Sequence, residues 1–219
     1  MEIKVLYEND YFIAVEKEYG IPSQPDKTGD EDLKTNVEKH CGKECFIINR
    51  IDRPVGGTVL FAKNGKTSAA LSDDITSGKI EKYYYAVVCG DIADSGRFED
   101  YMVKDGRNNV SSIADKSKKG AKKAVLEYNK IKTLADEDFE YLSLVEIKLL
   151  TGRHHQIRVQ FSSRGYGLYG DSKYNKSFYK KRKYYSTALW SSRIKFRFNK
   201  EEFDIKSTPK GEIFEKFGF

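Results

Sequence analysis

The chain is 219 residues long, with 39% hydrophobic, 13% aromatic and 33% charged residues. This apolar content suffices for a buried core and argues against intrinsic disorder. No run approaches the roughly 18 apolar residues that a membrane-spanning helix needs. The first residues show neither a signal-peptide nor a transit-peptide pattern, so we expect a cytoplasmic protein. The net charge of +6 is modest, so the places where charges gather matter more than their sum.

The cysteines are too few and too scattered to organise the fold. Cys41, Cys45 and Cys89 are odd in number and form no CxxC pair. They indicate neither a disulfide framework nor a thiolate zinc site, and we expect reduced thiols.

Strands outnumber helices in the predicted elements. Alternating and aromatic-rich segments between turn residues predict strands at residues 3–7, 11–17, 46–49, 58–63, 81–88, 97–103, 124–131, 141–150, 193–198 and 201–205. Helices are predicted at residues 30–40, from the N-cap Asn64 to a stop at Gly78, and at residues 153–163. Most connections are too short for the helical crossovers of a parallel sheet. We therefore predict an α+β fold with a mostly antiparallel mixed sheet, forming a single domain over residues 1–219.

A charged loop separates two of the hydrophobic strands. Pro54, Gly56 and Gly57 break regular structure between residues 46–49 and 58–63, and Asp52 lies there between two arginines. Arginines on both sides favour the carboxylate form, which a nucleophile or general base requires. A simple loop salt bridge is the alternative interpretation.

A second polar cluster, residues 151–158, reads Thr-Gly-Arg-His-His-Gln-Ile-Arg and follows a predicted strand. Adjacent histidines suggest a metal, but they point to different sides of a helix, and no Cys or further His lies at ligand spacing. The cluster therefore favours donors that hold an anionic, hydrogen-bonding ligand over a metal site.

Two basic stretches indicate a nucleic-acid partner. Residues 173–185 interleave lysines and Arg182 with tyrosines, and residues 116–123 hold five lysines. Charge runs are usually solvated surface, yet cations beside stacking rings are what RNA recognition needs.

Read together, these segments resemble the RluA family of RNA pseudouridine synthases. The family's Arg-Leu-Asp signature, followed by Gly and an apolar strand ending Phe-Ala-Lys, corresponds to residues 50–63. The Lys-x-Tyr-x-Ala pattern matches residues 82–86, Thr-Gly-Arg-x-His-Gln-Ile-Arg matches residues 151–158, and Gly-Asp-x-x-Tyr matches residues 170–174. Four motifs in the family's order are far more specific than any one of them.

The chain departs from the family pattern at two places. Asn49 stands where the family has His before Arg-Leu-Asp, and Ser186-Thr187-Ala188 stands where Leu-His-Ala is expected. The matched blocks also leave no room for the extra N-terminal RNA-binding domain of many relatives, so we expect the catalytic domain itself to select the target.

The resemblance implies a pseudouridine synthase catalytic fold with a central RNA-binding cleft. It implies that Asp52 is the catalytic carboxylate, that Arg158 pairs with it, and that Tyr84 lies against the uracil. The implied reaction breaks the N1–C1′ bond of a uridine, which cannot be reached inside a stacked helix, so the target base must be flipped out. The residues expected to contact RNA or support the site are Arg50, Lys82, Arg153, His155, Gln156, Lys180, Lys181, Arg182 and Lys183.

The implied activity is isomerisation of a specific uridine in structured rRNA or tRNA by a monomeric enzyme that uses neither a cofactor nor a metal. Two other classes remain open from the residues alone. A noncatalytic RNA-binding protein would keep the basic stretches, and a metal-dependent phosphodiesterase would use the two histidines with Asp52.

Overall fold

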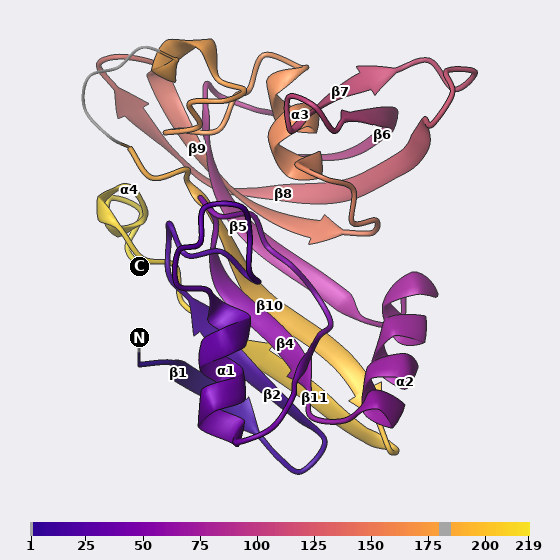
Figure 1. Ribbon diagram of the computed structural model, residues 1–219. Helices are drawn as coiled ribbons and strands as arrows, with labels where there is room; N and C mark the ends of the chain where they lie inside the picture. Colours follow the sequence, from indigo (N-terminus) through magenta and orange to yellow (C-terminus); the bar gives the residue numbers. More distant parts are fainter. Residues whose placement is uncertain (1, 180–184) are drawn as a thin grey trace. The chain divides into compact units, whose positions relative to one another are not determined.

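The computed structural model describes residues 2–179 and 185–219 (Figure 1). Within them, the strands are β1 Lys4–Glu8, β2 Phe12–Lys17, β3 Phe46–Ile47, β4 Gly56–Ala62, β5 Glu81–Cys89, β6 Ser95–Asp105, β7 Val110–Ala114, β8 Lys122–Asp136, β9 Glu140–Leu149, β10 Leu189–Phe198 and β11 Glu201–Lys206. The helices are α1 Leu33–Cys41, α2 Gly65–Thr76, α3 Gln156–Ser162, α4 Glu212–Glu215 and a 3₁₀ turn, Lys176–Phe178. None of the helices in the described part of the chain is long and apolar enough to cross a membrane.

The chain forms two compact units. Unit 1 comprises residues 1–82 and 190–210, and unit 2 comprises residues 83–189 and 211–219. The predicted N-cap Asn64 accepts the Thr67 N–H at the start of α2 in unit 1. Asp32, which was not predicted as a cap, accepts the Thr35 N–H at the start of α1 in the same way.

Unit 1 is a mixed sheet. Strand β2 pairs antiparallel with β1 and β4, β4 pairs parallel with β10, and β10 pairs antiparallel with β11. Every residue of β2 and β4 is buried, as expected for central strands with both faces covered. Their rings and aliphatic groups form a core with Leu71 of α2 and with Phe196 and Phe203 of β10 and β11.

Unit 2 is an antiparallel sheet in the order β5, β9, β8, β6, β7. Helix α3 packs on it through Phe161, whose ring lies 5.0 Å from that of Phe98 on β6 and 5.5 Å from that of Tyr128 on β8. This contact fixes the helix that carries Arg158.

The predicted α+β class with a mostly antiparallel mixed sheet is confirmed, with local corrections. Strand β7, helix α4 and the 3₁₀ turn Lys176–Phe178 were not predicted. The third helix begins at Gln156 rather than at residue 153 because His155 adopts a left-handed backbone, with φ 55°. His154 and Arg158 therefore do not share a helical face. A single domain and a central cleft stay predictions.

Candidate functional site

The loop that carries Asp52 joins β3 to β4 in unit 1. The Val55 N–H donates to the Asp52 carbonyl at 2.9 Å and closes a tight turn. Ser23 Oγ, on the proline-containing loop upstream, donates to the Ile51 carbonyl at 2.7 Å. The half-buried Asp52 thus lies on backbone that is anchored by a buried hydroxyl rather than by regular structure.

A buried ammonium group holds the other side of this loop. Lys17 lies at the end of β2, and its Nζ donates at 2.9, 2.7 and 3.2 Å to the carbonyls of Glu18, Ile21 and Arg53. Burial lowers the pKa of Lys17 to about 7, and the Asp52 carboxylate opposes this shift. Because Arg53 follows Asp52 directly, the Lys17 bonds constrain the backbone that presents the carboxylate.

Asn49 supports the start of the loop, although it replaces the histidine of the family pattern. Its side chain is buried against β4, where Nδ2 donates to the Thr58 carbonyl at 3.3 Å and Oδ1 accepts the Leu60 N–H at 2.8 Å. Both ends of the amide are used, so Asn49 connects the residue before Arg50 to a fully buried strand.

The two arginines beside Asp52 have different environments. Arg53 Nε donates to the Gly20 carbonyl at 2.8 Å, and the guanidinium forms an ion pair with Asp30. Arg50 is exposed to solvent. Arg53 therefore shapes the loop, and Arg50 is the one of the two that is open to a ligand.

Strand β5 carries Lys82 and Tyr84 on one face. Both are buried, whereas Tyr83 and Tyr85 are half-buried, as expected for a strand whose side chains alternate between two faces. Tyr84 lies opposite Ile147 of β9. A contact of Tyr84 or Lys82 with RNA stays a prediction.

Gln156 orders the loop before α3. Its Oε1 accepts from Thr151 Oγ1 at 2.7 Å and from the Arg153 N–H at 3.0 Å, and its Nε2 donates to the Val125 carbonyl at 3.1 Å. The amide is buried, so these bonds stabilise the loop from within. The side chain of Arg153 is exposed, and its Nε donates to the Lys123 carbonyl at 2.8 Å.

His155 is buried and neutral. Its Nδ1 lies 2.6 Å from the Tyr174 hydroxyl, which also accepts the Ser111 N–H at 2.9 Å. The direction of the hydrogen bond between Nδ1 and the hydroxyl follows from the tautomer of the ring. Burial first, and then the positive charge of Arg158, lower the pKa of His155 to about 2.

The neighbouring His154 forms hydrogen bonds with residues of the β6–β7 hairpin. Its Nδ1 lies 2.8 Å from Ser111 Oγ and its Nε2 lies 3.1 Å from Asn109 Oδ1. Its ring stacks on that of His155 at 3.7 Å, and both residues precede α3, so the expectation that they point to different sides of a helix is wrong. Among residues 2–179 and 185–219, no three His, Cys, Asp or Glu side chains gather as metal ligands.

Arg158 has a buried partner that the sequence interpretation missed. Its Nε and Nη2 donate to the two carboxylate oxygens of Asp171 at 2.8 and 2.7 Å, and the two side chains are 4% and 1% exposed. Asp171 belongs to the Gly-Asp-x-x-Tyr motif, and its place in that motif is the sequence signal that could have pointed to it as a site residue. The predicted pair of Arg158 with Asp52 stays a prediction, since the two residues belong to different units.

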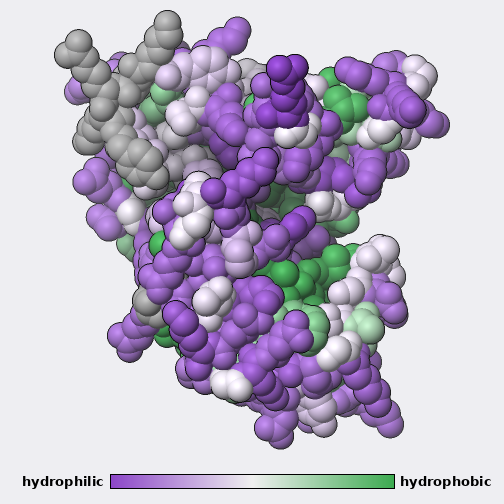
Figure 2. Space-filling view, viewed as in Figure 1, coloured by the Kyte–Doolittle hydropathy of each residue, from purple (hydrophilic) through white to green (hydrophobic). Residues whose placement is uncertain are grey.

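Of the two basic stretches, the structure describes residues 116–123 completely and residues 173–185 only in part. Residues 180–183 lie outside the described residues. In the stretch 116–123 all five lysines are exposed, and Lys123 forms an ion pair with Glu99 at 2.5 Å. On the face shown in Figure 2, hydrophilic residues predominate around β6 and β7, next to this stretch.

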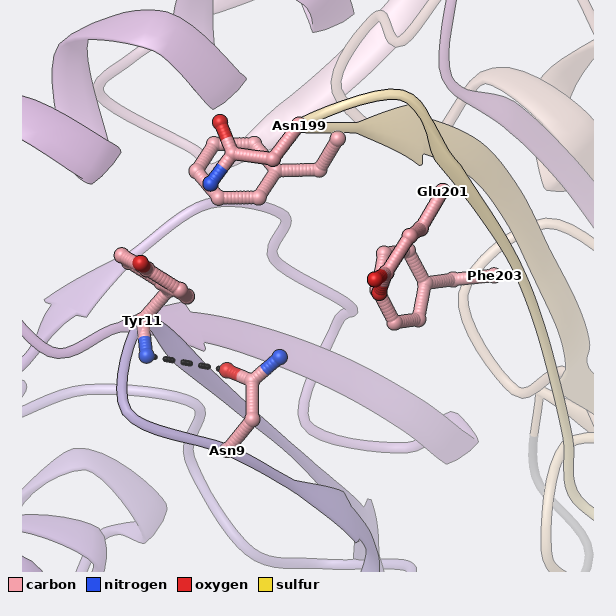
Figure 3. A pocket seen from close by; sticks show the side chains of 6 residues that line it. Asn9, Tyr11, Asn199, Glu201 and Phe203 are labelled. Carbon is pink, nitrogen blue, oxygen red and sulfur yellow. Dashed lines mark hydrogen bonds between the residues drawn. The ribbon is translucent and has the colours of Figure 1, made fainter.

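A shallow pocket in unit 1 lies at the opposite end of β2 from Lys17. Asn9, Tyr11, Glu201 and Phe203 line it together with Phe198 and Asn199, and Asn9 Oδ1 accepts the Tyr11 N–H at 2.9 Å (Figure 3). Because Phe12 pairs with Ala62, and Lys17 with Gly57 at the start of β4, the pocket is separated from the Asp52 loop by the length of the strand.

Comparisons with known proteins agree with the motifs. The family described as RNA pseudouridylate synthase matches residues 11–163. An uncharacterized RNA pseudouridine synthase of Mycoplasma genitalium is 31% identical over 208 residues, which cover 89% of this chain and 64% of the relative. The tRNA pseudouridine synthase C of Vibrio parahaemolyticus is 28% identical, covering 95% of this chain and 91% of the relative.

The fold also matches a solved structure. Human RNA Pseudouridylate Synthase Domain Containing 1 superposes with a TM-score of 0.79 at 18% identity, covering 95% of this chain and 84% of that one. At this identity the likeness shows the fold.

Proposed function

This chain belongs to the RNA pseudouridylate synthase family, and we propose that it isomerises a uridine in tRNA or rRNA to pseudouridine with Asp52 as the essential carboxylate. The reaction breaks the N1–C1′ bond, turns the bound base and rejoins it through C5, so it is redox-neutral and proposed to need no cofactor. The observation that carries the proposal is the match of residues 11–163 to the family, with Asp52 inside a matched motif.

The surroundings of Asp52 suit this role. A catalytic carboxylate must be held still yet remain accessible. The Lys17, Ser23 and Asn49 side chains hold the loop backbone, while the Asp52 side chain is only half-buried. A Coulombic attraction links the charged forms of Lys17 and Asp52.

Arg50 is proposed to occupy the space that the flipped uridine leaves in the RNA. It is exposed two residues before Asp52, and a guanidinium can both stack on bases and bond to phosphate. A base must leave the stack before its glycosidic bond can be reached, so a residue that fills the gap lowers the cost of flipping.

Arg158 and Tyr84 are proposed to act on the aspartate and on the uracil, respectively. The support for both roles is the family resemblance together with their burial on α3 and β5. Lys82, Arg153, His155 and Gln156 are proposed to contact the RNA or support the site, and residues 180–183 to contact phosphates beyond the target nucleotide.

The name of the Vibrio relative favours tRNA as the substrate, and rRNA remains the second candidate. The enzyme is further proposed to act as a cytoplasmic monomer, which light scattering after size-exclusion chromatography tests. Release of tritium from C5-labelled tRNA and rRNA transcripts distinguishes a synthase from a noncatalytic RNA-binding protein. Cleavage of the RNA that stops when metal ions are chelated would instead indicate the metal-dependent phosphodiesterase.

The decisive variant is Asp52→Asn, which keeps the shape of the side chain and removes its charge. We expect tritium release to fall at least a thousandfold, on the order of 4 kcal/mol in the barrier, with RNA affinity within threefold of the wild type. Asp26→Asn is the matched control, because Asp26 is an exposed carboxylate of the same unit that only orders Thr28. Turnover of Asp52→Asn within about tenfold of the wild type, a change of about 1.4 kcal/mol, removes Asp52 from catalysis.

A further inference from the structure

Asp171 is placed by the backbone rather than by Arg158. Its Oδ1 accepts the N–H groups of Lys173 at 3.0 Å and Tyr174 at 3.2 Å, and its carbonyl accepts the Asn175 N–H at 2.9 Å. This single helical turn follows Gly170, whose φ of +75° and close approach to the Ser186 carbonyl exclude a side chain. The carboxylate therefore has a fixed position against which the arginine orients.

The carboxylate binds the guanidinium of Arg158 side-on. Nε and Nη2 lie 2.8 and 2.7 Å from the two oxygens of Asp171, so the pair defines both the direction and the plane of the group. A single hydrogen bond would leave the guanidinium free to rotate. In this buried position the negative charge also keeps Arg158 from being an uncompensated cation.

The Tyr174 ring supports the same guanidinium from a second direction. The Cζ of Arg158 lies 5.1 Å from the centre of the ring. The ring is held in turn through its hydroxyl, which bonds to Ser111 N–H and His155 Nδ1. The turn after Gly170 thus supplies both the anion and the aromatic face that fix Arg158.

We propose that Asp171 is a positioning residue for the isomerisation, acting only through Arg158. The inference rests on the proposed function, in which Arg158 orients Asp52 and favours its ionised form. A bidentate partner on one edge of the guanidinium sets the direction in which its remaining N–H groups point. Loss of that partner should misdirect Arg158 without removing it, so the chemical step should suffer more than RNA binding.

Asp171→Asn tests the proposal, because the amide keeps the shape but offers one oxygen acceptor instead of two. We expect kcat for pseudouridine formation to fall at least 30-fold, with KM for RNA within threefold. The control is Asp204→Asn, which alters a side-on pair of the same geometry with Arg193, at 2.5 and 2.7 Å on the exposed part of unit 1. Its kcat should stay within twofold of the wild type.

Two measurements separate positioning from a merely structural role. The Nε–H resonance of Arg158, assigned by its loss in Arg158→Lys, should exchange with solvent at least tenfold faster in Asp171→Asn. In the Arg158→Lys background, Asp171→Asn should lower kcat no further than twofold, because a lysine cannot use the bidentate partner. If Asp171→Asn does not fold, the proposal is tested by the kcat of Arg158→Lys, which should fall at least 30-fold.

The proposal is overturned if Asp171→Asn keeps kcat within threefold, if KM alone changes, or if its loss is the same in the Arg158→Lys background. An Arg158→Lys enzyme within threefold of wild-type kcat overturns it as well, since orientation would then be irrelevant. Failure of the proposed function has a different signature: the wild type would release no tritium from any RNA, while the Nε–H exchange would still report the Arg158–Asp171 pair.

Discussion

Mild acid should destabilise this protein through one buried histidine. The pKa of His155 is lowered to about 2 in the folded state, whereas an unperturbed histidine titrates near 6.5. Between these values the unfolded state binds one more proton than the folded state, so stability falls as the pH falls below about 6.5. The structural cause is the burial of the ring, to which the nearby positive charge of Arg158 adds.

The size of the effect follows from the linkage. A difference of one bound proton changes the free energy of unfolding by about 1.4 kcal/mol per pH unit, so titration of His155 should make the protein about 1.5 kcal/mol less stable at pH 5 than at pH 6.5. Urea unfolding at both pH values measures this difference. The window lies above the usual carboxyl pKa values and below the pKa of about 7 to which burial lowers Lys17, so Asp, Glu and Lys17 contribute little to it.

His155→Asn should abolish most of the fall, since asparagine tolerates a left-handed backbone and its oxygen can accept the Tyr174 proton. His40→Asn is the matched control, because His40 is an exposed residue of α1 in unit 1, and this variant should keep the wild-type fall. The reasoning is refuted if His155→Asn still loses about 1.5 kcal/mol between pH 6.5 and pH 5, or if the wild type loses less than about 0.5 kcal/mol.

Two further outcomes are expected. Asn49→Ala leaves the buried Leu60 N–H without its acceptor and should cost about 1 to 3 kcal/mol in urea unfolding, and a loss below about 0.5 kcal/mol would contradict a supporting role. Neutralising residues 180–183 together should weaken RNA binding and flatten the slope of log K against log salt, because fewer counterions are released. An unchanged slope would identify this run as solvated surface, and the chemistry on a bound uridine should survive either way.

Local sequence signals predicted most of the elements. The N-cap Asn64, the glycine and proline breaks around Asp52, and the alternation along β5 each depend on neighbours within a few residues. Strand β7 was missed because its sequence, Val-Ser-Ser-Ile-Ala, is short and does not alternate between apolar and polar residues. It is a strand because β6 offers it an antiparallel partner.

The candidate site, too, could be predicted from the sequence only in part. The order of the motifs identified the family and singled out Asp52, Tyr84 and Arg158, because residue types at fixed spacing can be recognised without coordinates. The sequence could not show that Asn49 keeps a supporting role through two backbone bonds. Nor could it show that Arg53 is already engaged by Asp30.

What the sequence determined by itself is therefore the class of fold, the family and the residues that carry the motifs. Only the tertiary structure decided that His155 is neutral and left-handed, that Lys17 braces the Asp52 loop, and that Arg158 is held by Asp171. The physical reason is that periodicity and turn chemistry act within a few residues. A buried charge or hydrogen bond instead depends on which distant segments exclude water around it, and that is set by the packing of the whole unit.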